Sequence, residues 1–216
     1  GTEVVVVEAT ERILAGIEPL LAEHLGSRLE QDGIDVRLNT TLVEVSERSV
    51  LVRDQNGDTV IDTDAVVVAV GRRPRTSGIG LEHAGVVPNA TGHLDVDDQL
   101  RTAVGHIRAI GDVTNGPALA HRAMAQGRAA AASIANRPGA YRPAAMPAVV
   151  FTTPEIATVG LRLDEALGRG LDARQVRFPL AANARGLTLG GDGFGLLVHE
   201  VRTGLVLGAH LLGPGV

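Results

Sequence analysis

The chain has 216 residues, 44% of them hydrophobic and 2% aromatic, so it is long enough for more than one small domain with cores of aliphatic side chains. Its net charge of −5 comes without a basic block, which argues against nucleic acid as a main partner. It has no cysteine, no signal-peptide pattern and no apolar run approaching the roughly 18 residues that span a bilayer. We therefore expect a soluble, cytoplasmic protein without disulfides, thiolate metal sites or thiol chemistry of its own, and with no membrane partner.

The first 62 residues predict a β-α-β unit followed by antiparallel strands. Val4–Val7 is a β-branched run typical of a strand buried on both faces of a parallel sheet. Pro19–Asp32 predicts a helix that begins at its proline and ends at Gly33, and Asp35–Leu38 predicts the returning strand. The expected apolar face of the helix consists of Leu20, Leu21, His24, Leu25 and Leu29. The short alternating segments that follow are residues 41–46, 49–54 and 59–62, with a hairpin turn at Asn56-Gly57.

Glu8 stands at the end of the first predicted strand. In a dinucleotide-binding β-α-β unit, an acid at a strand end bonds to the adenosine ribose about 20 residues after a glycine-rich turn. This sequence does not contain that turn. From the residues alone, Glu8 is therefore interpreted as a solvated carboxylate at a strand end.

The segment DAVVVAVG, Asp64–Gly71, predicts another buried strand, and its final glycine would allow a cofactor to approach closely. Arg72 and Arg73 follow, and they either contact a phosphate or lie on a loop surface. Residues 79–102 predict a short helix, a loop and a short strand.

Residues 106–136 carry the most informative pattern in the chain. His106–Ile110 predicts a short buried strand, Gly111 a turn, and residues 118–136 a long alanine-rich helix. Asp112 lies directly after the turn, in a loop at the carboxyl end of the strand. Ligands of open α/β sheets bind at such positions, where a carboxylate can hold sugar hydroxyls and the N–H groups of a helix start can hold an electron-rich edge. Gly127 costs about 1 kcal/mol relative to alanine inside a helix, so it indicates close approach of a backbone or a flat ligand.

A boundary is expected near residues 143–147, where RPAAMP interrupts the pattern. Beyond it, residues 163–168 predict a helix. Residues 173–178, 194–200 and 205–212 predict an antiparallel sheet with a turn at Thr203-Gly204. Asn183 and Arg185 either bond across a subunit interface or lie in an exposed loop.

Four segments resemble the pyridine nucleotide–disulfide oxidoreductase family and occur in that family's order: VVVVEATERIL, AVGRRPRT, IGDVTNGPALAH and PAVVFTTPEIATVGL. Within the family, GPALAH and FPLAANARGL resemble the dihydrolipoamide dehydrogenases more than the glutathione or mercuric reductases. The resemblance implies an α/β protein in which residues 1–70 end a Rossmann-like NAD-binding domain. Residues 71–146 would then be the second segment of an FAD-binding domain, and residues 147–216 the start of an α+β interface, or dimerisation, domain.

The resemblance also implies roles for individual residues. Asp112 would bind the ribityl chain of FAD, and backbone groups of Ala118, Leu119, Ala120 and His121 would meet the pyrimidine edge of the flavin. Beside the flavin edge, His121 would help to balance its charge, but a packing histidine is the favoured interpretation.

For NAD, the resemblance implies that Glu8 binds the ribose, Leu42 the adenine and Gly71 another part of the cofactor. Ordinary strand core explains Leu42 as well as adenine contact does. A carboxylate at Glu8 would repel the extra phosphate of NADP, so NAD is expected.

The implied activity is NAD-linked oxidation of protein-bound dihydrolipoamide by a homodimer that serves the lipoyl domain of a 2-oxo acid dehydrogenase complex. The redox disulfide CxxxxC, both glycine-rich turns and the C-terminal His–Glu pair of the family are not in this sequence. We therefore expect a piece of a larger enzyme that holds no catalytic residue, is inactive alone and binds FAD weakly or not at all. The alternatives are another disulfide reductase of the family, a non-catalytic dimerisation module built on residues 147–216, or a structural α/β domain.

Overall fold

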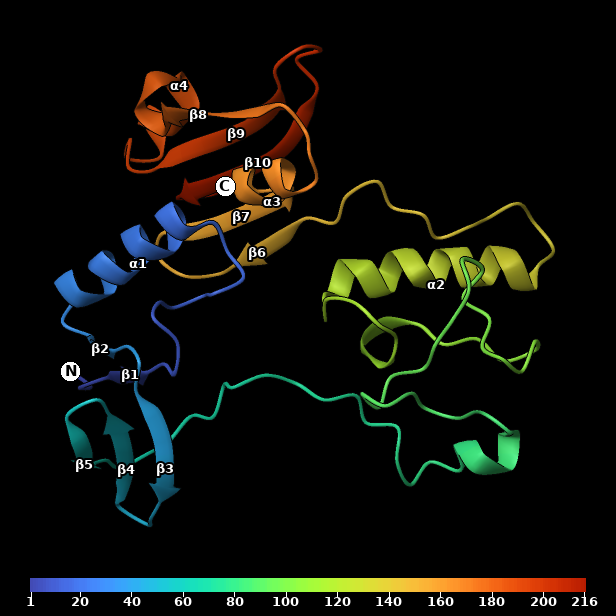
Figure 1. Ribbon diagram of the computed structural model, residues 1–216, viewed down its shortest axis with the longest axis horizontal. Helices are drawn as coiled ribbons and strands as arrows, with labels where there is room; N and C mark the ends of the chain where they lie inside the picture. Colours follow the sequence, from blue (N-terminus) through green and yellow to red (C-terminus); the bar gives the residue numbers. More distant parts are fainter. The chain divides into compact units, whose positions relative to one another are not determined.

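A computed structural model describes all 216 residues, which form two compact units (Figure 1). The first unit comprises residues 1–68 and 147–216, and the second comprises residues 69–146. The predicted division into three domains concerns the whole protein and stays a prediction.

The β-α-β pattern predicted near the start of the chain is confirmed. Strand β1 (Val5–Val7) pairs in parallel with β2 (Asp35–Arg37), and helix α1 (Pro19–Gln31) connects them. Proline stands in the first turn of α1, and Gly33 follows the helix with a φ of 83°. On the helix, Leu21 and Leu25 are buried as expected, whereas Leu20 is 40% exposed and does not belong to the packed face.

An antiparallel meander follows the β-α-β unit, as predicted. It consists of β3 (Thr41–Val45), β4 (Ser49–Asp54) and β5 (Gly57–Asp62), in that order. The turn between β4 and β5 depends on Gly57, whose φ is 118°, and on Asp54, whose carboxylate accepts a hydrogen bond from the Asn56 amide at 2.7 Å.

Residues 147–216 form an antiparallel five-stranded sheet in the order β6-β7-β10-β9-β8, with two short helices (Figure 1). The strands are β6 (Ala148–Val150), β7 (Glu155–Gly160), β8 (Ala173–Pro179), β9 (Phe194–Glu200) and β10 (Val206–Gly213). The helices are α3 (Leu163–Gly168) and α4 (Ala184–Thr188). The predicted helix at 163–168 and the three predicted strands are confirmed.

The main core of the first unit lies where α1 packs on this sheet. Leu21 and Leu25 of α1 are at most 1% exposed and cluster with buried side chains of the sheet: Ile156, Phe194, Leu196 and Leu212. Apolar burial of this kind contributes roughly 25 cal/mol per Å², so α1 and the sheet stabilise each other. None of the helices is both long and apolar enough to cross a membrane.

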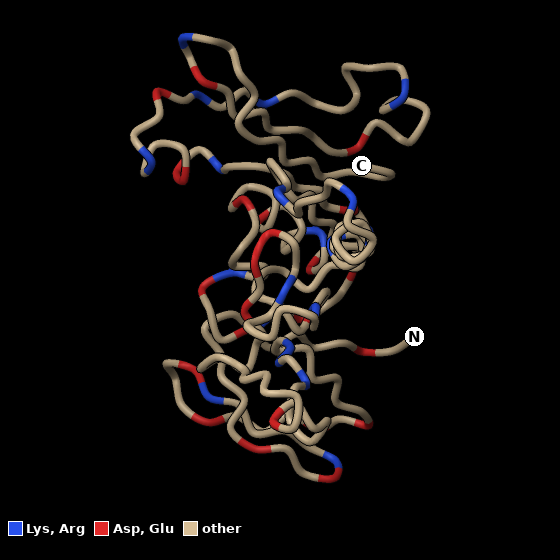
Figure 2. Tube along the Cα trace, turned by 90° about the vertical axis from the view of Figure 1, so that its right-hand side faces the viewer, with Lys and Arg blue, Asp and Glu red and all other residues tan.

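The second unit contains little regular structure besides α2 (Ala120–Ile134). Two 3₁₀ turns, η1 (Leu81–Ala84) and η2 (Gly111–Val113), precede it, and the core centres on Val86, Leu94 and Ala109. Figure 2 shows acidic and basic residues interspersed along the whole chain, without a long block of one sign.

Three predicted strands are wrong. The short strand expected within residues 79–102 forms only isolated bridges, of Leu94 with Thr114 and of Arg101 with Arg108. Residues 106–110 form only an isolated bridge, between Arg101 and Arg108. The chain reverses direction between residues 102 and 107, so this stretch bonds to the segment directly before it and not to a strand. Residues 64–71 are extended but unpaired. Val67 and Val70 are each 89% exposed, since no strand of this chain lies beside them to complete a ladder.

Candidate functional site

The loop that begins at Gly111 and the start of α2 form the candidate site. Gly111 has a φ of 73°, and a side chain there would place its Cβ 3.3 Å from the Cβ of Ala123. Both features favour glycine, so the predicted turn is confirmed. The turn places the next residue, Asp112, at the surface.

Asp112 is accessible. Its side chain is 48% exposed, and the nearest cation is Arg72, whose Nη1 lies 3.6 Å from Asp112 Oδ2. The side chain of Arg72 is itself 81% exposed, so this ion pair is weak and open to solvent. An acceptor in this position can take hydrogen bonds from the hydroxyls of a ligand.

The start of α2 is uncovered as well. Leu119 precedes the helix in an extended conformation, no side chain caps the first turn, and no acidic residue lies within that turn. The positive end of the helix dipole therefore faces outward between the small, exposed Ala118 and Ala120. Along the same helix Met124 is 60% exposed, which adds an apolar surface beside His121.

Two buried polar side chains of α2, Arg122 and Gln126, form hydrogen bonds to the loop, and neither was predicted from the sequence. They are 4% and 2% exposed. The Oε1 atom of Gln126 accepts a hydrogen bond from the Gly111 amide at 2.6 Å. Arg122 donates to Thr114 Oγ1 at 2.8 Å, and to the carbonyls of Gly111, Asn115 and Pro117.

We call this arrangement the Arg122–Gln126 clamp. No carboxylate pairs with Arg122, and its guanidinium donates to loop oxygens, which are three carbonyls and the Thr114 hydroxyl. The signal available in the sequence was the spacing of four residues between two long polar side chains on an otherwise alanine-rich helix. The clamp fixes the shape of the loop that carries Asp112.

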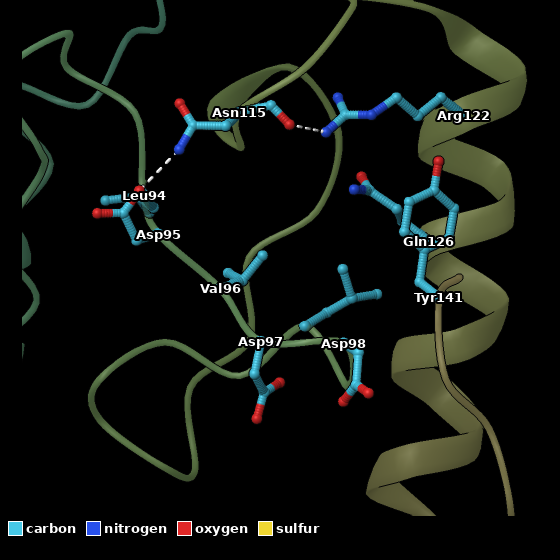
Figure 3. Close-up of a pocket in the computed structure, with 10 residues that line it drawn as sticks. Leu94, Asp95, Val96, Asp97, Asp98, Asn115, Arg122, Gln126 and Tyr141 are labelled. Atoms are coloured by element: carbon cyan, nitrogen blue, oxygen red, sulfur yellow. Dashed lines mark hydrogen bonds between the residues drawn. The ribbon is translucent and has the colours of Figure 1, made fainter. Parts of the chain in front are cut away.

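A cavity of 320 Å³ lies on the inner side of the clamp (Figure 3). Asn115 spans one edge, where its side-chain amide donates to Asp95 Oδ1 at 2.7 Å and its carbonyl accepts from Arg122. Asp97 and Asp98 line the opposite edge, where both carboxylates bond to arginines, Arg101 and Arg142. None of the residues expected to contact flavin lines this cavity.

The residues expected to contact NAD divide between the units. Glu8 and Leu42 belong to the first unit, where the Glu8 carbonyl accepts from the Thr40 amide at 2.9 Å and so brings the start of β3 beside the end of β1. The Glu8 carboxylate accepts from the amide and hydroxyl of Thr10, both at 2.8 Å and both on Oε1. Leu42 is 40% exposed, and Gly71, in the second unit, has a φ of 123°.

The two residues proposed for a subunit contact differ in their surroundings. Asn183 caps α4, and its side-chain oxygen accepts from the Gly186 amide at 2.7 Å. Arg185 is exposed in the first turn of the same helix. A local structural role therefore accounts for Asn183.

Two family models match the chain. Residues 1–127 match the pyridine nucleotide-disulphide oxidoreductase model, and residues 146–216 match the dimerisation domain of the same family. The chain belongs to the pyridine nucleotide-disulphide oxidoreductase family. The resemblance identified from four sequence segments is thereby confirmed, and so is the mixed α/β fold.

Similar proteins in this family include two dihydrolipoyl dehydrogenases, from Geobacillus stearothermophilus and Pseudomonas aeruginosa. Each is 42% identical, over 99% and 100% of this chain respectively and over 47% of the relative. Among solved structures, LpdA from Mycobacterium tuberculosis superposes with a TM-score of 0.88 at 29% identity, over 99% of this chain and 47% of the other. The flavoprotein disulfide reductase RclA from Escherichia coli superposes with a TM-score of 0.87 at 28% identity, over 100% and 50%. The chain thus spans about half the length of the curated relatives it matches.

Proposed function

We propose that this chain supplies the flavin-loop and interface portions of an NAD-linked dihydrolipoamide dehydrogenase. The observation that carries the proposal is the unit formed by Gly111, Asp112 and the uncapped start of α2, in a family member whose relatives include dihydrolipoyl dehydrogenases. The residues present fit a flavin, because they offer an exposed carboxylate, a positive helix end and small side chains beside an exposed apolar surface.

Asp112 would accept hydrogen bonds from the ribityl hydroxyls of FAD, and the backbone of Ala118, Leu119, Ala120 and His121 would face the pyrimidine edge. The helix end stabilises negative charge placed there, which favours the reduced flavin. When bound, FAD supplies the two-electron carrier between a pair of thiols and NAD. This chain has no cysteine, so it contributes binding and electrostatics and no thiol chemistry of its own.

Glu8 would hold the adenosine ribose of NAD, Leu42 would cover the adenine, and Gly71 would contact another part of the cofactor. Glu8 is supported by its place at the end of β1 and by the bonds that hold its Oε1, which keep the carboxylate in one orientation. A negative charge beside the ribose would repel the extra phosphate of NADP, so NAD is the proposed nucleotide.

The proposed partners are a second copy of the same protein and a lipoyl domain of a 2-oxo acid dehydrogenase complex. The match of residues 146–216 to a dimerisation domain supports the first. The names of the relatives support the second.

A chimera tests the proposal. This chain would replace the matching segment of the Geobacillus stearothermophilus relative, and purified chimera would be assayed for FAD content and for dihydrolipoamide oxidation with NAD and with NADP. We expect bound FAD, activity with NAD in preference to NADP, and loss of about 10-fold or more in FAD affinity on Asp112→Asn, since hydrogen bonds to a charged group contribute about 1.5–3 kcal/mol.

The matched control is Asp192→Asn, an exposed aspartate of the first unit, which should leave FAD affinity unchanged. A folded chimera that binds FAD equally well with and without Asp112 would exclude the proposed flavin role. Preference for glutathione disulfide or mercuric ion over dihydrolipoamide would assign the chain to another branch of the family.

A further inference from the structure

A second, smaller cavity lies in the first unit, where the beginning of α1 meets the sheet. Its volume is 110 Å³. The lining residues are Gly16, Ile17, Glu18, Thr158, Gly160, Arg162, Glu165 and His210. Along α1 the apolar contacts of Leu21 and Leu25 with the sheet therefore end at a polar chamber.

His210 of β10 lines this chamber with one nitrogen unsatisfied. The residue is 2% exposed, and its Nε2 lies 3.1 Å from the carbonyl oxygen of Leu161. A carbonyl only accepts, so Nε2 carries the hydrogen and donates. In the neutral ring Nδ1 is then an acceptor, and it has no hydrogen-bond partner.

Glu18 enters the same chamber from the residue that precedes α1, and it is 7% exposed. Burial raises the pKa of the Glu18 carboxyl, while electrostatic interactions with His210 and Arg162 and a hydrogen bond from the Leu20 backbone amide oppose that rise. Glu18 therefore keeps a proton at a higher pH than an ordinary glutamate does, and a protonated carboxyl has the O–H donor that Nδ1 lacks.

The other charged groups around the chamber are already paired with one another. Arg162 bonds to Asp164 at 3.0 Å, lies 3.4 Å from Glu165 and donates to the Gly16 carbonyl at 3.3 Å. The hydrogen bond from Arg162 lowers the pKa of Asp164. No group of three or more His, Asp or Glu side chains in the structure could hold a metal ion.

We propose that this chamber is a water site that links the Glu18 carboxyl to Nδ1 of His210, and that the proton on Glu18 governs how firmly the start of α1 is held on the sheet. The volume exceeds the roughly 10–15 Å³ that one water requires, and Glu18, Thr158 and Nδ1 of His210 supply the two to four polar partners that a buried water needs. The protonated carboxyl donates to the water, and the water donates to Nδ1.

The direction of the pH dependence follows from the sign of the Glu18 shift. The pKa of Glu18 is raised in the folded state. The protonated carboxyl therefore contributes fully to the free energy of unfolding below the ordinary glutamate value of 4.5, and this contribution is lost as the pH rises through the raised pKa. When the proton leaves to solvent, a charged carboxylate remains buried with only the Leu20 backbone amide as its hydrogen-bond partner, and Nδ1 of His210 loses its bridged donor. The start of α1 should then loosen.

The first experiment compares the thermal midpoints of the chain and of Glu18→Gln between pH 4 and pH 8. Glutamine keeps the shape of the neutral side chain, so the midpoints should coincide near pH 4. At pH 8 the variant should melt about 2–4 °C higher, the shift that a change of about 1 kcal/mol produces in a protein of this size. Glu23→Gln, an exposed glutamate of the same helix, should show no difference that grows with pH. A constant offset between wild type and Glu18→Gln across this range would overturn the proposal.

The second experiment does not depend on the folding of a variant. NMR titration of the unaltered chain would follow the Glu18 carboxyl carbon. We expect a midpoint above the ordinary glutamate value of 4.5, together with magnetisation transfer from a long-lived water to the chamber. A Glu18 carboxyl that titrates in the ordinary range, or a chamber without a long-lived water, would overturn the proposal.

Discussion

Two glycines of the second unit show how differently the same residue type is constrained. Gly111 has a φ of 73° and almost no room for a Cβ, whereas a Cβ at Gly127, inside α2, would meet only Ile110 Cδ1, at 3.7 Å. Within this chain nothing requires glycine at position 127. No backbone of the chain makes the close approach that we expected there, and the approach of a flat ligand stays a prediction.

The prediction at this scale is a pair of alanine substitutions. Gly111→Ala should lower the free energy of unfolding by about 1–2 kcal/mol, the cost of left-handed backbone for a residue with a side chain. Gly127→Ala should raise it by up to about 1 kcal/mol, because alanine is the better helix former. Urea unfolding of both variants measures the difference, and equal effects of the two substitutions would contradict the assignment of strain to the Gly111 turn.

At the scale of elements, α2 stabilises the loop in front of it through side chains rather than through its backbone. The Arg122–Gln126 clamp bonds to carbonyl, hydroxyl and amide groups of the loop, and Gln126 is the partner of the buried Gly111 amide. Such groups cost free energy when they are left unpaired. The conformation of the loop, and the exposure of Asp112 with it, therefore depends on two residues that never reach the outer surface.

Removing the guanidinium tests that dependence. Arg122→Met should destabilise the chain by about 1–3 kcal/mol, since the hydrogen bonds of a buried charged donor to the loop are lost. Hydrogen exchange should also accelerate at the amides of the loop before exchange elsewhere. Arg128→Met, an exposed arginine of the same helix, is the control and should change stability by no more than about 0.5 kcal/mol. A similar small effect of both substitutions would show that the clamp does not hold the loop.

At the scale of the whole molecule, the most conspicuous feature is an apolar run left in solvent. Val66, Val67, Val68 and Val70 are between 40% and 89% exposed, in extended backbone with no paired strand. Unpaired apolar strands are templates for association with other chains. We therefore expect the isolated chain to form assemblies larger than a dimer.

Charged substitutions in this run should suppress such assembly. The double variant Val67→Lys with Val70→Lys should reduce scattering from large species at high protein concentration while leaving the thermal midpoint within a few degrees, because neither side chain is packed. Val87→Lys replaces an 81% exposed valine outside the run and should have little influence on assembly. Light scattering against concentration distinguishes these outcomes. Unchanged assembly in the double variant would place the association elsewhere.

The sequence by itself determined the elements whose signals are local. Periodic leucines, a proline at the start and a glycine at the end specified α1, Asn56-Gly57 specified the hairpin of the meander, and Gly111 specified the turn that exposes Asp112. Ordered family segments were enough to assign the chain to its family, because each segment preserves the residues that a particular turn or close approach requires.

Tertiary structure decided what depends on neighbours distant in sequence. DAVVVAVG has the composition of a buried strand, but a strand exists only where another segment supplies hydrogen-bonding partners, and none in this chain does. The pairing of Gln126 with Gly111 and the meeting of Glu18 with His210 arise from packing across 15 and more residues, which no local pattern encodes. Local propensity therefore set the conformation of α1 and the turns, whereas burial and the satisfaction of polar groups set the loop at Asp112 and the chamber beneath α1.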